Sequence, residues 1–416
     1  LEHVLWSSLS FLEILLIPGS RVQNRDYYFR RGISYSTIGN TFKSRVHRYR
    51  SVIDVSGASV FLDDIHVEEG CCSLNSRGPT QIVQDLNPTQ NFQVGDIKRI
   101  PFEQQHFAKM IFTELYKAFD KHESHRENSM EFKEPGSSNW NDVQTWAKKM
   151  VNLPKEDSLQ EYTPSFESEK DIDHLSYAWG IALGRFHPDG RGIVNPQEDN
   201  LDFALPNGYL FLNGTLSPES TQDSLGHSAC SRLHQEWNLR SKAIIEFHNK
   251  TYAKASKDKL NSDVDLRSYL QRHFFIFHLE TYKKRPIYWP LTSKKNNFVV
   301  WINIHRLEFS SFEKIYSELE RAQLELKKVL STANKIDRIE LQNHFDELVD
   351  FMFTMKRCFT KGPDDKVEKQ AQYSPEQRDG VMVNSAPLYP ILDPLWNGKN
   401  APKEWWIKLC DDAKKN

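Results

Sequence analysis

A short stretch near the start of the chain combines many cations with aromatic rings. Between Arg21 and Arg50 the only acidic residue is Asp26. The cations are Arg21, Arg25, Arg30, Arg31, Lys43, Arg45, Arg48 and Arg50, and the rings between them include Tyr27, Tyr28, Phe29, Tyr35 and Phe42. Guanidinium groups pair with phosphates and read guanine edges, and aromatic rings can stack on bases. The stretch predicts contact with double-stranded DNA, although a solvated basic loop on an ordinary fold would have the same composition.

Other residue types that carry chemistry are sparse. His122 and His125 have the spacing of a metal-ligand pair, but no third ligand lies nearby, so we expect a helix end facing solvent and no metal. Five cysteines form no Cys-x-x-Cys pair, and Cys71 and Cys72 are adjacent. This pattern is typical of reduced thiols in a cytoplasmic protein. No Ser-His-Asp arrangement or phosphate-binding loop stands out.

Two blocks rich in aromatic residues and proline stand in the last third of the chain. The first is Lys283-Lys-Arg-Pro-Ile-Tyr-Trp-Pro-Leu-Thr-Ser293, followed closely by Phe298-Val-Val-Trp-Ile-Asn-Ile-His-Arg306. The second is Arg378-Asp-Gly-Val-Met-Val-Asn-Ser-Ala-Pro-Leu-Tyr-Pro-Ile-Leu392. Arg285 and Trp289 could face DNA. We favour a structural corner in which Trp289 fills a core, because large aromatic side chains are usually buried. The pair His305-Arg306 allows the same two interpretations.

These blocks, in this order, resemble the C-terminal half of the large adenine-specific DNA methyltransferases of BREX-type phage-defence systems. The resemblance runs from about Ser20 to Trp406. It implies S-adenosyl-L-methionine as the cofactor of the full enzyme, double-stranded DNA as its substrate, and other defence-system proteins as further partners. Gly32 to Phe61 resembles the opening of a target-recognition domain, and Phe92 to Phe102 resembles its closing strand. The residues expected to bind DNA are Arg30, Arg31, Tyr35, Lys43, Arg45, Arg48 and Arg50.

The chemistry of methyl transfer is not visible in this sequence. Adenine methyltransferases use a loop of the form Asp/Asn-Pro-Pro-Tyr/Phe, whose ring stacks on the flipped base. The chain has no Pro-Pro dipeptide, and its nearest string is Asn87-Pro-Thr-Gln90. Gly180 and Gly184 fall inside a predicted helix and not in a cofactor-binding turn. We therefore expect the catalytic residues and the cofactor site to lie upstream, outside this chain. The first residue is leucine, which favours a truncated or mis-framed start.

Composition and periodicity predict an α+β fold. Of the 416 residues, 38% are apolar and 26% charged, which is a globular composition, and the net charge of −2 means that DNA affinity must come from a local surface. Val4 to Ile17 is apolar but too short to cross a bilayer, so no membrane partner is expected. We expect four segments: 1–19 unassigned, 20–105 a β-rich recognition module, 106–260 a helical or mixed region, and 261–416 a C-terminal region with the aromatic-proline blocks.

Several elements are predicted from local patterns. Short β-branched and aromatic runs punctuated by glycine predict strands over residues 27–101. Apolar residues at helical spacing predict helices from Phe107 onward, from Asp173 as N-cap, and over Leu266–Phe277. Strands are predicted at Tyr209–Leu212 and Phe298–Ile304. The stretch from Phe309 to Lys356 has no proline or glycine and predicts a helical hairpin that breaks near Thr332–Lys335.

The function expected from these patterns is recognition of DNA. In the primary hypothesis the chain is the target-recognition and C-terminal part of a site-specific adenine-N6 methyltransferase. In the alternative it is a stand-alone DNA-binding or scaffold subunit of a defence complex that does not take part in methylation.

Overall fold

A computed structural model of the chain shows two compact units of α+β architecture. It describes residues 24–53, 57–62, 67–103, 105–154, 156–195, 201–214, 223–283, 285–335, 337–363, 373–376, 379–396 and 401–415. Unit 1 takes the chain up to His122 together with Ser138–Glu167, and unit 2 takes Glu123–Ser137 together with Ser168–Asn416. The expected boundaries after residues 105 and 260 fall inside units 1 and 2 respectively. The expected unassigned start, 1–19, lies outside the described residues.

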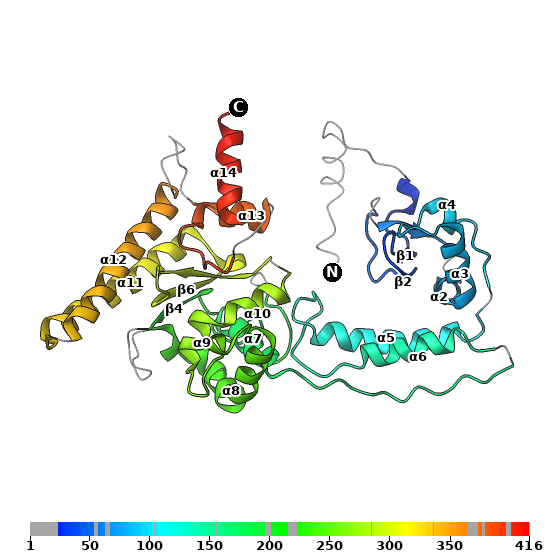
Figure 1. Ribbon diagram of the computed structural model, residues 1–416, viewed down its shortest axis with the longest axis horizontal. Coiled ribbons are helices and arrows are strands. Elements are labelled where there is room, and N and C mark those ends of the chain that lie inside the picture. Colours follow the sequence, from blue (N-terminus) through cyan, green and yellow to red (C-terminus); the bar gives the residue numbers. More distant parts are fainter. Residues whose placement is uncertain are drawn as a thin grey trace. The chain divides into compact units, whose positions relative to one another are not determined.

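Unit 1 contains a small antiparallel sheet with short helices beside it, and two longer helices complete the unit (Figure 1). The strand order is β2-β1-β3. The strands are β1 (Ile33–Tyr35), β2 (Ser44–Val46) and β3 (Ser59–Val60), and the helices are α2 (Val67–Asn75), α3 (Arg77–Leu86), α4 (Val94–Ile97), α5 (Ala108–His125) and α6 (Trp140–Met150). Ile33, Val67 and Val83 are almost fully buried in the shared core. One face of the sheet therefore packs against the hydrophobic core of unit 1, and the other face does not.

The prediction of strands over residues 27–101 is wrong for its second half. Residues 67–97 fold mainly into α2, α3 and α4. Pro79 stands in the first turn of α3, where its missing N–H costs nothing, and Ser76 precedes the helix. The expected closing strand at Phe92–Phe102 is instead the short helix α4, which Gln93 and Asp96 cap reciprocally. These helix-start signals outweigh the β-branched residues nearby.

Unit 2 contains a second antiparallel sheet, of order β4-β6-β5, that is buried on both faces. Its strands are β4 (Tyr209–Asn213), β5 (Tyr288–Thr292) and β6 (Phe298–Asn303). On one face Trp301 contacts Trp179 at 5.4 Å and Phe275 at 5.8 Å between ring centroids. On the other face the hydroxyl of Tyr209 donates to Glu318. A strand covered on both sides needs a continuous apolar run, which is why β4 and β6 were predictable.

Helices cover both faces of this sheet. One set includes α7 (Asp171–Ala182), α8 (Ser231–Thr251), α9 (Leu266–Arg272) and α10 (Phe274–Thr281), and the chain ends with α13 (Gly380–Ser385) and α14 (Pro402–Ala413). The prediction of one helix over Leu266–Phe277 is wrong in detail, because the helix is interrupted at His273. Asp173 is not the N-cap of α7, which begins two residues earlier after Lys170.

Two long consecutive helices, α11 (Phe309–Thr332) and α12 (Asp337–Thr360), pack against each other (Figure 1). The rings of Phe312 and Phe359 stack with centroids 4.6 Å apart. Asn334 accepts a hydrogen bond from the backbone N–H of Asp337 and so satisfies a donor at the start of α12. The buried stripe of α11 has steps of three and four and consists of Phe312, Ile315, Leu319, Ala322 and Leu326.

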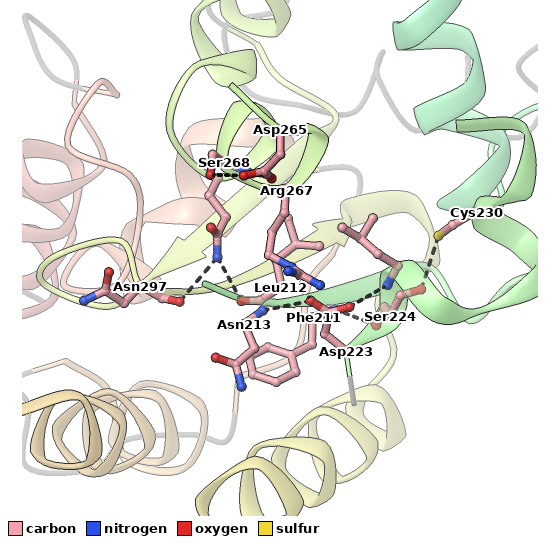
Figure 2. A network of polar contacts seen from close by, with 12 residues as sticks. Phe211, Leu212, Asn213, Asp223, Ser224, Cys230, Asp265, Arg267, Ser268 and Asn297 are labelled. Atoms are coloured by element: carbon pink, nitrogen blue, oxygen red, sulfur yellow. Dashed lines mark hydrogen bonds and ion pairs between the residues drawn. The ribbon is translucent and has the colours of Figure 1, made fainter. Parts of the chain in front are cut away.

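A buried ion pair holds the end of β4 (Figure 2). Asp223 accepts from Arg267 Nε at 2.7 Å and from the backbone N–H groups of Asn213 and Leu225. The carboxylate therefore ties α9, the last residue of β4 and the following 3-10 turn together. Gln271, one turn further along α9, donates to the backbone carbonyl of Leu212.

Candidate nucleic-acid interface

The cations expected to bind DNA all belong to unit 1, but the structure divides them into two groups. Lys43 and Arg45 are exposed, on and just before β2, and their side chains have no partner among the described residues. Arg50 is likewise exposed, and its side chain has no partner in that part of the chain. Arg30 is exposed and its guanidinium lies over the ring of Tyr27, 5.4 Å from the centroid. These four side chains are available to a polyanion.

The second group consists of cations that are already paired within unit 1, and Arg31 is one of them. Its guanidinium donates to Glu68 Oε1 at 2.7 Å and to the hydroxyl of Tyr116. Partial burial acts to lower the pKa of Arg31, but Tyr116 and Glu68 together outweigh it and raise that pKa above its ordinary value. The contact joins the segment before β1 to α2 and α5. Arg31 therefore has a structural partner that a phosphate would have to displace.

Arg48 is also paired. It donates to Asp120 Oδ1 at 2.6 Å and lies over the ring of Phe119 at 5.4 Å. The pair is partly exposed, and such pairs contribute at most about 1 kcal/mol in solution. A phosphate could compete for Arg48 more easily than for Arg31.

Tyr35 does not belong to the exposed surface, and its expected contact with DNA needs correction. Its side chain is only 5% exposed and its ring packs 5.7 Å from that of Phe42. Burial is also the main reason why the pKa of Tyr35 is raised. Because strand residues alternate between faces, the buried Ile33 and Tyr35 share the core face of β1. The ring has no open surface on which a base could stack.

His47 was not singled out from the sequence, although it stands two residues beyond Arg45. Its Nε2 lies 2.9 Å from the hydroxyl of Ser59, so it bridges β2 toward β3. Burial lowers the pKa of His47, and the nearby Arg45 lowers it further. The spacing 43, 45, 47 was the available signal, because alternate strand residues share a face.

The aromatic-proline blocks form the buried edge of the unit 2 sheet. Trp289 is 0% exposed, its Nε1 donates to the carbonyl of Pro286 at 2.9 Å, and its ring lies 5.5 Å from that of Trp396. The structural interpretation of Trp289 is therefore confirmed. Arg306 donates to the carbonyl of Pro206. Arg285 is exposed.

The two blocks meet along β5. The carbonyl of Pro290 accepts a hydrogen bond from the N–H of Asp393, and Thr292 donates to the carbonyl of Ile391. Proline is tolerated at an edge strand because its missing N–H faces away from the sheet ladder. An open cavity of about 420 Å³ adjoins this junction, with the ion pair Lys294–Asp350 beside it. Arg378, the first residue of the second block, lies outside the described residues.

The remaining residues named from the sequence have local structural partners. His122 lies 3.0 Å from the hydroxyl of Ser138, and His125 lies 3.0 Å from the carbonyl of Ser137. Over the described ranges no group of three or more His, Cys, Asp or Glu side chains is arranged to hold a metal ion. The five cysteines are buried and unbridged, and burial raises the pKa of Cys71 to about 11.

Gly180 lies within α7 and Gly184 follows its C-cap. A Cβ on Gly180 would lie 2.3 Å from the ring of Phe186, and Gly184 has a φ of +68°. Helix packing and a left-handed helix end account for both glycines. None of the helices seen in the described part of the chain is long and apolar enough to span a membrane.

Comparison with known proteins relates the chain to two bacterial adenine-specific methyltransferases. It is 22% identical over 443 residues to the adenine-specific methyltransferase BrxX of Escherichia coli O9:H4 (strain HS), an alignment that covers 88% of the chain. It is 23% identical over 442 residues to the adenine-specific methyltransferase PglX of Lacticaseibacillus casei (strain Zhang), with 89% of the chain covered. The chain spans only 36% of the length of either relative. No family model matches it.

Proposed function

We propose that this chain is the DNA-recognition part of a site-specific adenine-N6 DNA methyltransferase of a BREX-like phage-defence system. The observation that carries the proposal is the group of exposed cations of unit 1, Arg30, Lys43, Arg45 and Arg50, whose charges are not neutralised by acidic side chains of the described residues. Four such charges on one small module suit a polyanion. The likeness to two adenine-specific methyltransferases supports duplex DNA as that polyanion.

In this proposal methyl transfer is the work of a part that this sequence does not contain. That part holds S-adenosyl-L-methionine, flips the target adenine and carries the catalytic loop. Unit 1 positions the duplex, and unit 2 joins the recognition module to the rest of a cytoplasmic assembly, which other defence-system proteins can bind. The 36% coverage of the relatives leaves ample length for such a part.

The second candidate is a stand-alone DNA-binding or scaffold subunit of a defence complex. The sequence has no Pro-Pro dipeptide, as this alternative also requires, so that observation does not separate the two candidates. The two differ in what accompanies the chain. Translation of the DNA immediately upstream, in every frame, should reveal an Asn-Pro-Pro-Tyr-type loop under the first proposal and none under the second.

DNA binding is tested first by titrating the whole chain with duplex DNA at several salt concentrations. Four phosphate contacts predict a log–log salt slope of about −3.6, at about 0.9 per contact. A chain that does not bind duplex DNA at low salt would contradict the first candidate and would leave only the scaffold role of the second. In a second assay, labelled S-adenosyl-L-methionine and unmethylated DNA should yield no N6-methyladenine with this chain alone. Reproducible label would place the catalytic site in this chain and overturn the proposed division of labour.

A further inference from the structure

The pairing register of the unit 1 sheet sorts its outward-facing side chains into columns. Ser34 pairs with Arg45 of β2 on one side and with Ser59 of β3 on the other. Because side chains alternate between faces and Ile33 and Tyr35 point into the core, this row lies on the outer face. Ser34, Arg45 and Ser59, one on each strand, therefore mark the outer face of the sheet.

Extending the register by one pair in each direction completes the columns. Continuing the antiparallel register sets Gly32 opposite His47, whose N–H donates to the Gly32 carbonyl. It sets Ser36 opposite Lys43, whose carbonyl accepts from the Ser36 N–H. The outer column of β2 and its flanks is therefore Lys43, Arg45 and His47, and the neighbouring column of β1 is Gly32, Ser34 and Ser36. A row of basic side chains runs beside a row of very small ones.

At one end of the small column, glycine at position 32 has a structural explanation. A Cβ on Gly32 would lie 2.8 Å from the ring of Phe61, so the close approach of Phe61 requires glycine there. Ser34 and Ser36 are partly exposed, and their hydroxyls donate to no side chain or carbonyl within the described residues. The hydrogen bond between His47 of the β2 column and Ser59 of β3 crosses β1 next to Ser34, which limits the size of the side chain at position 34. Nothing in the packing of the described residues explains why position 36 is small and polar.

We propose that this outer face is the surface on which unit 1 seats the sugar–phosphate backbone of duplex DNA. Lys43 and Arg45 neutralise phosphates, and the hydroxyls of Ser34 and Ser36 donate hydrogen bonds to phosphate oxygens that approach over the small column. Serine hydroxyls and basic side chains are the usual partners of phosphate oxygens, and such contacts fix the register of the protein on the duplex. This inference rests on the proposed function, and it names the face and the ligand group that the function uses.

Other parts of unit 1 suit this role less well. Arg31 and Arg48 are engaged with Glu68 and Asp120. His47 of the β2 column is held across β1 by its hydrogen bond to Ser59 of β3, so it does not reach outward. Lys43 and Arg45 are about 7 Å apart along the strand, as alternate residues must be, and both are free to point at one strand of a duplex.

The test compares the whole chain carrying Lys43→Ala and Arg45→Ala with a control carrying Lys148→Ala and Lys149→Ala. The control removes the same charge from the last turn of α6 in the same unit. Removing two phosphate contacts should reduce the log–log salt slope for a random-sequence duplex by about 2, and the control should leave the slope unchanged. Equal slopes for the two double variants would overturn the proposal even if the parent chain binds DNA well.

Ser36 provides a test that does not depend on charge. Ser36→Leu fills the end of the small column that lies away from His47, and Ser36→Ala removes only the hydroxyl. The leucine should weaken DNA binding by about tenfold or more, and the alanine by less, while thermal unfolding of both variants stays close to that of the parent. Full DNA affinity in a folded Ser36→Leu variant would place the backbone elsewhere on unit 1. A parent chain that binds no duplex DNA would instead overturn the proposed function itself.

Discussion

Nε of Arg267 lies 2.7 Å from Oδ2 of Asp223, and the two side chains are 7% and 0% exposed. The same carboxylate accepts from backbone N–H groups at the end of β4 and in the turn that follows it. The Asp223–Arg267 pair therefore holds three chain segments together. The partly exposed pair Arg48–Asp120 has a weaker structural role.

Removal of Arg267 should therefore destabilise unit 2 strongly. Arg267→Ala leaves a buried carboxylate without its cation, and we expect a loss of about 3–5 kcal/mol in the free energy of unfolding by denaturant. Arg272→Ala is the matched control, because Arg272 stands one turn away and makes an exposed hydrogen bond to Asn297. The control should lose under about 1.5 kcal/mol. Similar losses for the two variants would mean that the buried pair is not a special determinant of stability.

Trp289 should act through stability and not through DNA. Trp289→Ala empties a fully buried aromatic site and should cost about 3–5 kcal/mol. DNA affinity per folded molecule should not change. Trp405→Ala, at a half-buried position on α14, should cost much less. Unfolding and DNA titration are measured on the same preparations, and a variant with normal stability but weaker DNA binding would reverse the assignment of Trp289.

Two leucines of α11 separate the buried and exposed sides of that helix. Leu326 is 5% exposed and Leu324 is 59% exposed. Leu326→Asp places an unpaired carboxylate in the buried stripe of α11 and should lower the melting temperature clearly, because burying a charge without a partner is costly. Leu324→Asp should have little effect. Equal melting temperatures would indicate that the buried stripe is open in solution.

Stability should fall as the solution becomes mildly acidic. Burial lowers the pKa of His278 well below its usual value, and burial also lowers the pKa of His248 to about 4. A lowered folded-state pKa means that the unfolded chain binds the proton first. The stabilisation is therefore present above about pH 6.5 and is lost as the pH falls toward the folded pKa.

Denaturant unfolding at a series of pH values between neutral and mildly acidic checks this dependence. Each histidine that stays neutral in the folded chain contributes at most about 1.4 kcal/mol per pH unit. His278→Gln retains an acceptor at about the reach of Nε2, near the N–H groups of Ile287 and Tyr288, and should show a shallower dependence than the parent. An unchanged pH dependence in that variant would show that His278 does not carry the effect.

Local sequence patterns determined the elements whose burial is simplest. Phe298–Asn303 is covered on both faces, so every residue is apolar or paired, and the run is visible as a strand without any knowledge of its neighbours. The stripe on α11 is similarly visible, because its period is that of a helix against one partner. The patterns failed over residues 67–97, where short helices pack on the sheet and neighbouring segments outweigh β propensity.

The composition of residues 21–50 marked unit 1 as basic, but only the tertiary structure decided which charges are available. Arg31 and Arg45 are indistinguishable as letters. Glu68 lies 37 residues from Arg31 in the chain yet 2.7 Å from it in space, while Arg45 points out from a strand whose neighbour offers only Ser34. Both the Arg31–Glu68 ion pair and the position of Arg45 beside Ser34 depend on tertiary contacts between segments that are distant in the sequence. Local sequence patterns do not specify these contacts.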